Sequence, residues 1–135
     1  MQSAPHTVPG SNTMRWAGRA MSALVALLLL FDCAIKVMRL PPAVEGTVRL
    51  GYPESLVFGI GIIELVCILV YVIPRTSVLG AILLTGYLGG AVATNLRVGN
   101  PLFSHVLFPI YVGVLVWGGL FLRDHRLRAL IPLRK

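Results

Sequence analysis

The sequence has little charge. Only 13% of its 135 residues are Asp, Glu, Lys or Arg, about half the share found in an ordinary soluble domain. With 56% hydrophobic residues and a mean hydropathy of +0.83, this scarcity excludes both a soluble globular domain and a disordered chain. It also argues against nucleic-acid binding, although the net charge is +7 and the isoelectric point about 10.3. The length allows one domain.

Cysteine is also scarce, and Cys33 and Cys67 do not form a Cys-x-x-Cys pair. A cysteine zinc site and a dithiol redox motif are therefore unsupported. The chain also lacks haem-ligand pairs, iron–sulfur cysteines and a dinucleotide fingerprint, so no cofactor and no metal is evident. Both thiols lie in apolar runs, and we expect them to be buried. A bridge between two helices is left open.

Long apolar runs dominate what is there, at residues 16–37, 55–73, 77–95 and 104–122. Each approaches the ~20 residues that a transmembrane helix needs. The runs lack period-2 alternation, and lipid requires every backbone group to be satisfied internally, so helices are favoured over strands. We predict an all-α integral membrane four-helix transmembrane bundle. It forms a single domain over residues 14–135, after a disordered polar tail at residues 1–13.

A longer connection, residues 39–54, separates the first two runs. Its middle, residues 43–50, is expected to form a short helix in the membrane interface. Val44 and Val48 would share one face of that helix, and Gly51 would cap its C-terminus. The predicted architecture is therefore four crossings with a short interfacial segment between the first and the second.

The basic residues are distributed unequally over the two sides that four crossings define. One side, which holds both termini, collects Arg15, Arg19, Arg75, Arg123, Arg126, Arg128, Arg134 and Lys135. The other side has Arg39, Arg49, Arg97 and, at the membrane edge, Lys36. The positive-inside rule then places both termini in the cytoplasm. We expect a multi-pass protein of the cell inner (plasma) membrane.

Polar residues also occur within or beside the apolar runs. They are Asp32, Lys36, Glu64, Asn95, Arg97 and His105. Ionisable groups inside a membrane usually face the interior of the bundle. The predicted topology brings all of these residues to the outer half, where we expect a polar pocket with Arg97 at its rim, and we expect nothing comparable in the inner half. Asp32 and Lys36 are four residues apart and can pair on one helix face.

Glu64 is the deepest of these charges, and a buried carboxylate needs a partner or must be neutral. Lys36 and Arg97 are the candidate cations, and Asn95 and Tyr87 the candidate hydrogen-bond donors. Two interpretations stay open. The cluster is either a structural clamp that fixes helix register, or a pocket for a polar ligand or for proton handling.

Small residues are abundant in the third run, where Gly86 and Gly90 form a Gly-x-x-x-Gly pair. Small residues let helices approach closely in membranes. Further small residues of the same run are Gly80, Ala81, Gly89, Ala91, Ala93 and Thr94. We expect these small residues to pack within the bundle rather than to form a dimer face.

Several stretches resemble the DoxX-like family of small four-helix bacterial membrane proteins. These stretches are residues 31–36, 50–53, 61–65, 80–91 and 100–103, together with Trp117 and residues 122–124. The resemblance runs from about residue 16 to the C-terminus and implies a four-helix transmembrane bundle in a bacterial inner membrane. It also implies a link to membrane redox work, since the wider group includes a subunit associated with thiosulfate oxidation by quinone, and to thiol stress.

The family's polar positions map onto Asp32, Lys36 and Glu64. Its third helix usually ends Thr-His-Leu-Arg, whereas residues 94–97 here read Thr-Asn-Leu-Arg. Asn95 keeps the hydrogen bonding of that position but does not titrate near neutral pH. If the family histidine shuttles protons or binds a metal, we expect this member to be impaired or divergent in that role.

Three functions are consistent with these features, and the sequence leaves open whether any is enzymatic. The first is a quinone-linked or redox-associated accessory subunit in the lipid bilayer with a redox protein partner. In that case Lys36 or Asn95 would bond the quinone carbonyls, and Glu64 or Asp32 would exchange protons. The second is a small-solute or proton pathway. The third is an assembly or stress-response membrane protein whose polar cluster is purely structural.

Overall fold

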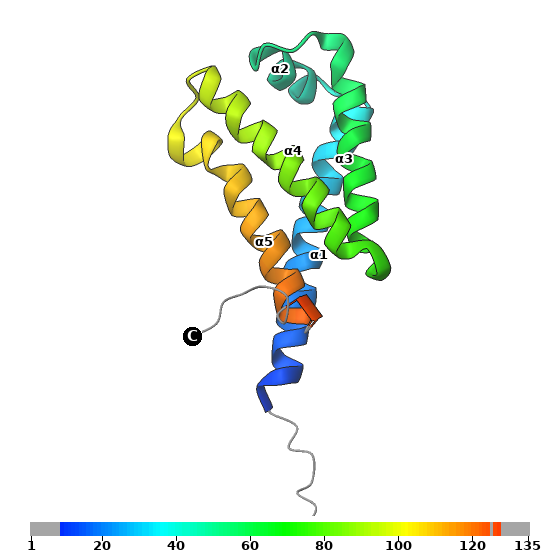
Figure 1. Ribbon diagram of the computed structural model, residues 1–135. Helices are drawn as coiled ribbons and strands as arrows, with labels where there is room; N and C mark the ends of the chain where they lie inside the picture. Colours follow the sequence, from blue (N-terminus) through cyan, green and yellow to red (C-terminus); the bar gives the residue numbers. More distant parts are fainter. Residues whose placement is uncertain (1–8, 125, 128–135) are drawn as a thin grey trace, which may run out of the picture.

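The protein was analysed as a computed structural model that describes residues 9–124 and 126–127. Over these residues the chain is helical and has no strand, which confirms the all-α prediction (Figure 1). The helices are α1 (Pro9–Val37), α2 (Pro41–Arg49), α3 (Val57–Val72), α4 (Ser77–Arg97) and α5 (Phe108–Arg123). Shorter turns connect them: η1 (Glu54–Leu56), η2 (Pro74–Thr76) and the π-helical turn η3 (Leu102–Val106).

Four segments of the described chain are long and apolar enough to cross a membrane, namely Asn12–Val37, Glu54–Val72, Pro74–Arg97 and Leu102–Arg123. Their outward surfaces carry large apolar side chains. Leu27 is 67% exposed, Phe31 70% and Val114 63%. Exposing so continuous an apolar surface to water would be unfavourable, whereas the lipid of a bilayer solvates it. The four predicted crossings are therefore confirmed.

Helix α1 begins at Pro9, inside the segment expected to be a polar tail. Proline suits a first helical turn, because its missing N–H would have no intrahelical acceptor there. Residues 1–8 of the expected tail lie outside the described residues. So do Arg128, Arg134 and Lys135 of the basic C-terminal segment.

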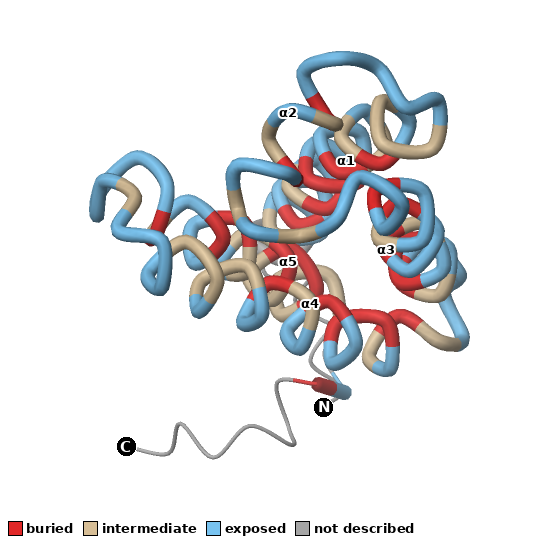
Figure 2. Tube along the Cα trace, turned by 90° about the horizontal axis from the view of Figure 1, so that it is seen from above, coloured by how far each residue is buried: buried red, intermediate tan, exposed pale blue. Residues whose placement is uncertain are grey.

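The bundle has two unlike ends, which we name by the short elements found there. The η2 end holds η2, the start of α1 and the end of α5, whereas the α2 end holds α2 and the link from α4 through η3 to α5. Figure 1 shows α1 and α5 side by side towards the η2 end, while the α4–α5 link spreads away from α2 at the other end. The buried residues, red in Figure 2, lie mainly on the sides of the helices that face the interior of the bundle.

Glycine sets the helix spacing at the η2 end. A Cβ added to Gly18 of α1 would lie 2.6 Å from the carbonyl oxygen of Gly119 in α5. A Cβ on Gly80 of α4 would collide with the backbone of Tyr71 in α3. Larger residues at these positions would push the helix backbones apart. The close approach at Gly80 was expected from the small residues of α4, whereas the one at Gly18 was not predicted.

Gly86 and Gly90 do not make such contacts. A Cβ at either position would meet nothing within 4 Å, so the expectation of close packing at this Gly-x-x-x-Gly pair is wrong. Spacing along one helix says that two small residues share a face, but it does not say which neighbour that face meets. Here the face borders open space rather than another helix.

The connection between α1 and α3 contains the predicted short helix, which runs from Pro41 to Arg49 rather than over residues 43–50. Helix α2 ends in a Schellman motif, in which Tyr52 N–H donates to Thr47 O (3.2 Å) and Gly51 N–H to Val48 O (2.9 Å). Gly51 takes φ +94°, a left-handed conformation that glycine adopts without cost. The face of α2 that packs on the bundle carries Ala43 and Thr47, whereas Val48 is 49% exposed.

Candidate functional site

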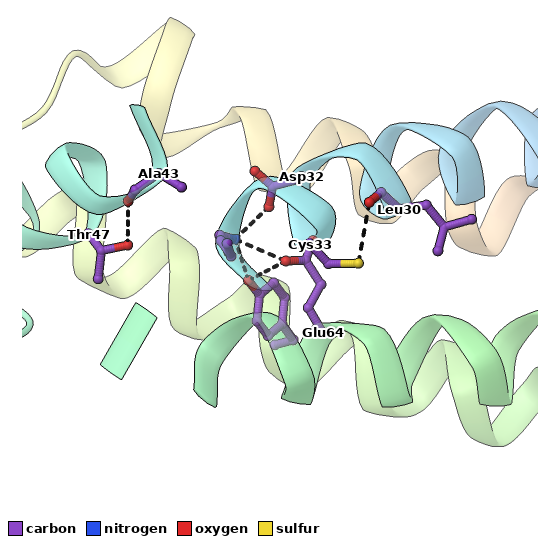
Figure 3. Close-up of polar contacts among 8 residues, drawn as sticks. Leu30, Asp32, Cys33, Ala43, Thr47 and Glu64 are labelled. Carbon is purple, nitrogen blue, oxygen red and sulfur yellow. Dashed lines mark hydrogen bonds and ion pairs between the residues drawn. The ribbon is translucent and has the colours of Figure 1, made fainter. Parts of the chain in front are cut away.

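Lys36 is the centre of a hydrogen-bonded cluster near the α2 end. Its ammonium donates to Asp32 Oδ2, to Glu64 Oε2 (2.9 Å) and to the hydroxyl of Tyr87 (2.8 Å). That hydroxyl donates in turn to Glu64 Oε2 (3.0 Å). Figure 3 shows Asp32 and Glu64 converging from two helices on this point. An ammonium has three N–H groups, so all three are engaged within the protein.

Local sequence explains how α1, α3 and α4 meet here. Asp32 and Lys36 lie one turn apart on the same face of α1, as their spacing predicted. Gly61 brings α3 against them, because a Cβ at this position would lie 2.8 Å from Lys36 Cβ. Glu64 follows Gly61 by three residues, on the same side of α3, and so reaches the ammonium. The role of Gly61 was not predicted, since nothing in its spacing distinguishes it from the other helical glycines.

Burial and charge within the cluster are unequal. Glu64 is fully buried, while the side chain of Lys36 is 17% exposed and that of Asp32 is 45% exposed. Glu64 Oε2 accepts two hydrogen bonds, but Glu64 Oε1 is buried without a partner. The two carboxylates share one ammonium, so this set carries a formal charge of −1 when both are ionised. An unneutralised charge inside a membrane carries an energetic cost, and residues that carry such a cost usually mark a functional site.

The other candidates take different places. Asn95 donates to Ala91 O (2.8 Å) and accepts from Asn100 Nδ2 (2.7 Å). His105 is exposed, with Nδ1 2.8 Å from Ser104 Oγ. Both Asn95 and His105 line a cavity with the cluster.

Arg97 takes no part in this cavity. It donates to the backbone oxygen of Leu50 (3.2 Å) at the C-terminus of α2. There it satisfies a free helix-end carbonyl, a common role for a basic side chain. Arg97 therefore neutralises neither Asp32 nor Glu64.

A cavity of about 500 Å³ lies under α2, between α1, α4 and the η3–α5 segment. This volume is in the range of small-molecule sites. Its charged lining residues are Asp32, Lys36, Arg49 and Glu64. Towards the membrane-facing surface the lining becomes apolar, where Leu28 is 41% exposed, Phe31 70% and Phe108 50%. The cavity thus has charged groups inside and an apolar opening between α1 and α5, while its exposed polar lining residues on α2 and η3 are Arg49, Ser104 and His105.

A smaller cavity of about 330 Å³ lies on the other side of Lys36 and Tyr87, which line both. Gly86 and Gly90 form part of its wall, which accounts for the open space beside them. Its lining is mostly apolar, apart from Lys36 and a few hydroxyl groups.

The η2 end contains a polar group that we did not expect. Ser22 Oγ lies 2.9 Å from the hydroxyl of Tyr71, which donates to Val116 O (2.9 Å). The guanidinium of Arg123 lies 5.7 Å from the centroid of the Tyr71 ring, and it donates to Ser77 Oγ at 3.5 Å. The expectation of nothing comparable in this half is therefore wrong. Apart from Arg123 this group is uncharged, so a search for ionisable residues missed it.

The cysteines are buried, as predicted, and both are free thiols. Cys33 Sγ donates to Leu30 O (3.3 Å) one turn back on α1 (Figure 3). Within residues 9–124 and 126–127, no three His, Cys, Asp or Glu side chains gather as metal ligands would.

Four crossing helices with short connections and a charged cluster held in their interior define a multi-pass membrane protein of the helical-bundle class. The sequence model of the DoxX-like family matches residues 20–119, and the chain belongs to this family. The match extends from α1 into α5 and includes every residue of the cluster around Lys36. No curated protein and no solved structure matches the chain.

Proposed function

We propose that this protein binds the headgroup of a quinone-type, lipid-soluble ligand in the larger cavity and acts as a redox-associated accessory subunit. One observation carries the proposal: the Asp32–Lys36–Glu64 cluster lines a cavity of about 500 Å³ whose exposed lining includes the apolar side chains of Leu28, Phe31 and Phe108. A ligand with an apolar chain and a compact polar headgroup matches that gradient.

The apolar and polar residues of the cavity would contact different parts of the ligand. Leu28, Phe31 and Phe108 offer an apolar entrance at the surface that lipid covers. Asp32 and Asn95 present hydrogen-bonding groups to the headgroup. Lys36 is a positioning residue in this proposal, because its three N–H groups hold the surrounding oxygens in place.

A redox role requires an electron-transfer partner. The sequence contains no haem-ligand pair, iron–sulfur cysteines or dinucleotide fingerprint. A membrane-bound or peripheral redox protein would therefore exchange electrons with the ligand, while this chain holds the headgroup and separates it from bulk water.

The proposed location is the bacterial inner membrane with both termini in the cytoplasm. Under this topology the predicted cytoplasmic side has the larger share of the Lys and Arg residues. Reporter fusions at the C-terminus and within α2 test the orientation. Cytoplasmic activity at α2 would contradict it.

A proton or solute pathway receives less support from the packing. Between the Lys36 cluster and the Tyr71 group the interior is filled by apolar side chains, including Leu29, Ile68 and Leu84. A continuous pathway would need polar groups or water through that layer. A purely structural cluster is the main competing interpretation, and the following experiment separates it from ligand binding.

The test is thermal unfolding of the full chain in nanodiscs, with and without a short-chain benzoquinone and its hydroquinone. A ligand that binds only the folded protein raises its stability. Gly46 lines the larger cavity from α2, and a Cβ there would meet nothing within 4 Å. Gly46→Leu should therefore fill the cavity without disturbing its walls, and it should abolish the stabilisation.

Gly59→Leu is the matched control, since Gly59 has the same open surroundings but lines neither cavity. It should keep the full ligand response. If neither ring form stabilises the wild-type protein, the proposed function is wrong and the cluster is structural.

A further inference from the structure

Hydrogen bonds within the protein use up the donors of the cluster. The three N–H groups of Lys36 go to Asp32, Glu64 and Tyr87, and the hydroxyl hydrogen of Tyr87 goes to Glu64. Neither side chain has a donor left for a ligand. A ligand carbonyl would have to break one of these bonds, and breaking it would leave a buried carboxylate with one partner fewer.

An acceptor is left free instead. Asp32 Oδ2 accepts from Lys36, and no hydrogen bond within the described part of the chain reaches Asp32 Oδ1. The Asp32 side chain is 45% exposed and lines the larger cavity. Glu64 Oε1 also lacks a partner but is fully buried. Asp32 Oδ1 is therefore the carboxylate oxygen that a molecule in the cavity can reach.

The remaining donors lie nearer the α2 end. Asn95 and Asn100 each use one N–H within the protein and keep another. Arg49, in the last turn of α2, also lines the cavity. Asp32 lies one helical turn farther from this end than Lys36. The cavity thus offers a hydrogen-bond acceptor, Asp32, farther from the α2 end and hydrogen-bond donors closer to it.

Charge favours a neutral ligand. The four charged side chains that line the cavity are Asp32, Glu64, Lys36 and Arg49, and their formal charges cancel. A cation would be repelled by Lys36, and an anion by the carboxylates. A neutral hydroxyl donates to a carboxylate without changing this balance.

We infer that the larger cavity selects the reduced, hydroxyl-bearing form of a quinone-type ligand over the oxidised form, with Asp32 Oδ1 accepting a hydrogen bond from the ligand hydroxyl. This inference rests on the proposed function and adds which redox form is held. A quinone carries only acceptors and would meet another acceptor at Asp32, whereas a hydroquinone donates to Asp32 and accepts from the amides near α2.

The test compares three ligands of one shape on the full chain in nanodiscs, by calorimetric titration. They are a short-chain hydroquinone, the matching quinone and the dimethyl ether of the hydroquinone. Because a hydrogen bond to a charged group contributes about 1.5–3 kcal/mol, the hydroquinone should bind at least about tenfold more tightly than the other two. Quinone binding equal to or tighter than hydroquinone binding would overturn the inference but leave the proposed function intact. No binding of any of the three would overturn both.

Asp32→Asn sharpens the comparison. Lys36 would hold the amide oxygen, so an N–H would replace the free acceptor, and the preference should disappear or reverse towards the quinone. Glu45→Gln is the matched control, because this exposed carboxylate of α2 does not line the cavity. It should keep the wild-type ratio. An unchanged ratio in folded Asp32→Asn would refute the role of Asp32. The wild-type comparison of hydroquinone and dimethyl ether does not depend on either variant.

Discussion

The two ends of the bundle are built differently. At the η2 end, Gly18 and Gly80 leave no room for a Cβ, and the polar groups around Tyr71 are mostly uncharged. At the α2 end, Gly86 and Gly90 border open space, and an ammonium with two carboxylates lies beside two cavities.

This difference indicates a division of labour. Tight packing at one end contributes van der Waals contact, which drives helix association in lipid where no hydrophobic force acts between helices. The α2 end has less contact between helices, because two cavities lie there, and it holds charged side chains at an energetic cost. A natural protein accepts such a local cost mainly where function needs it. The following predictions test this comparison, beginning with the largest expected effect.

Lys36→Met should cause the greatest loss at the α2 end. It leaves Glu64 fully buried without its cation, and breaking a buried pair in this way costs ~3–5 kcal/mol of unfolding free energy. Equilibrium unfolding in mixed micelles measures the loss. Adding Glu64→Met should recover most of it, because an apolar pair needs no neutralisation. A double variant no more stable than the single one would show that Glu64 is not the group that depends on Lys36.

Gly80→Val should be the most damaging change at the η2 end. The new side chain would collide with the backbone of Tyr71, which cannot move aside as a side-chain tip can. Overpacking costs about 1–3 kcal/mol and occasionally more, and a collision with backbone should lie at the upper end of this range. Gly90→Val introduces the same side chain on the same helix into open space and should change stability by less than about 0.5 kcal/mol. Equal losses in the same unfolding assay would contradict the contrast between the two ends.

Tyr71→Phe should cost about 1 kcal/mol, since it removes one hydroxyl from a neutral network. It should leave ligand binding at the other end unchanged, because apolar side chains separate the two groups. Unfolding and calorimetric titration on the same sample check both parts. A large loss of ligand affinity would mean that the two ends are coupled.

Arg39→Gly should stabilise the protein by about 0.5 kcal/mol. Arg39 lies two residues after the end of α1 and has φ 53°, a left-handed conformation that costs a non-glycine residue ~1–2 kcal/mol. Glycine would remove this cost, but it loses more backbone entropy on folding, which offsets part of the gain. Gly99→Ala is the opposite change at the end of α4, where φ is +76° with open space around it. It should destabilise the fold by about 1 kcal/mol. Effects of the same sign in the two variants would be inconsistent with this explanation.

Sequence reasoning predicted the four crossings, the short helix between the first two and the glycine that caps it. It also identified the three charged residues that meet at the cluster. It missed the packing glycine Gly61. Among the small residues of α4 it expected close contacts at Gly80, where the structure has them, but also at Gly86 and Gly90, where the structure has space. It assigned Arg97 to the pocket rim, whereas Arg97 holds the end of α2.

What the sequence determined by itself is the class of the protein and the depth of its polar residues. Hydropathy, run length and turn residues act locally, so they can be read along the chain. Only the tertiary structure decided which helix faces meet and where the cavities lie. It also decided that Lys36 donates all three of its N–H groups to side chains within the protein. These depend on the rotation and crossing of each helix, which follow from all its contacts together. The sequence therefore predicts that a charged residue is buried, and the packing of the helices decides which residue pairs with it.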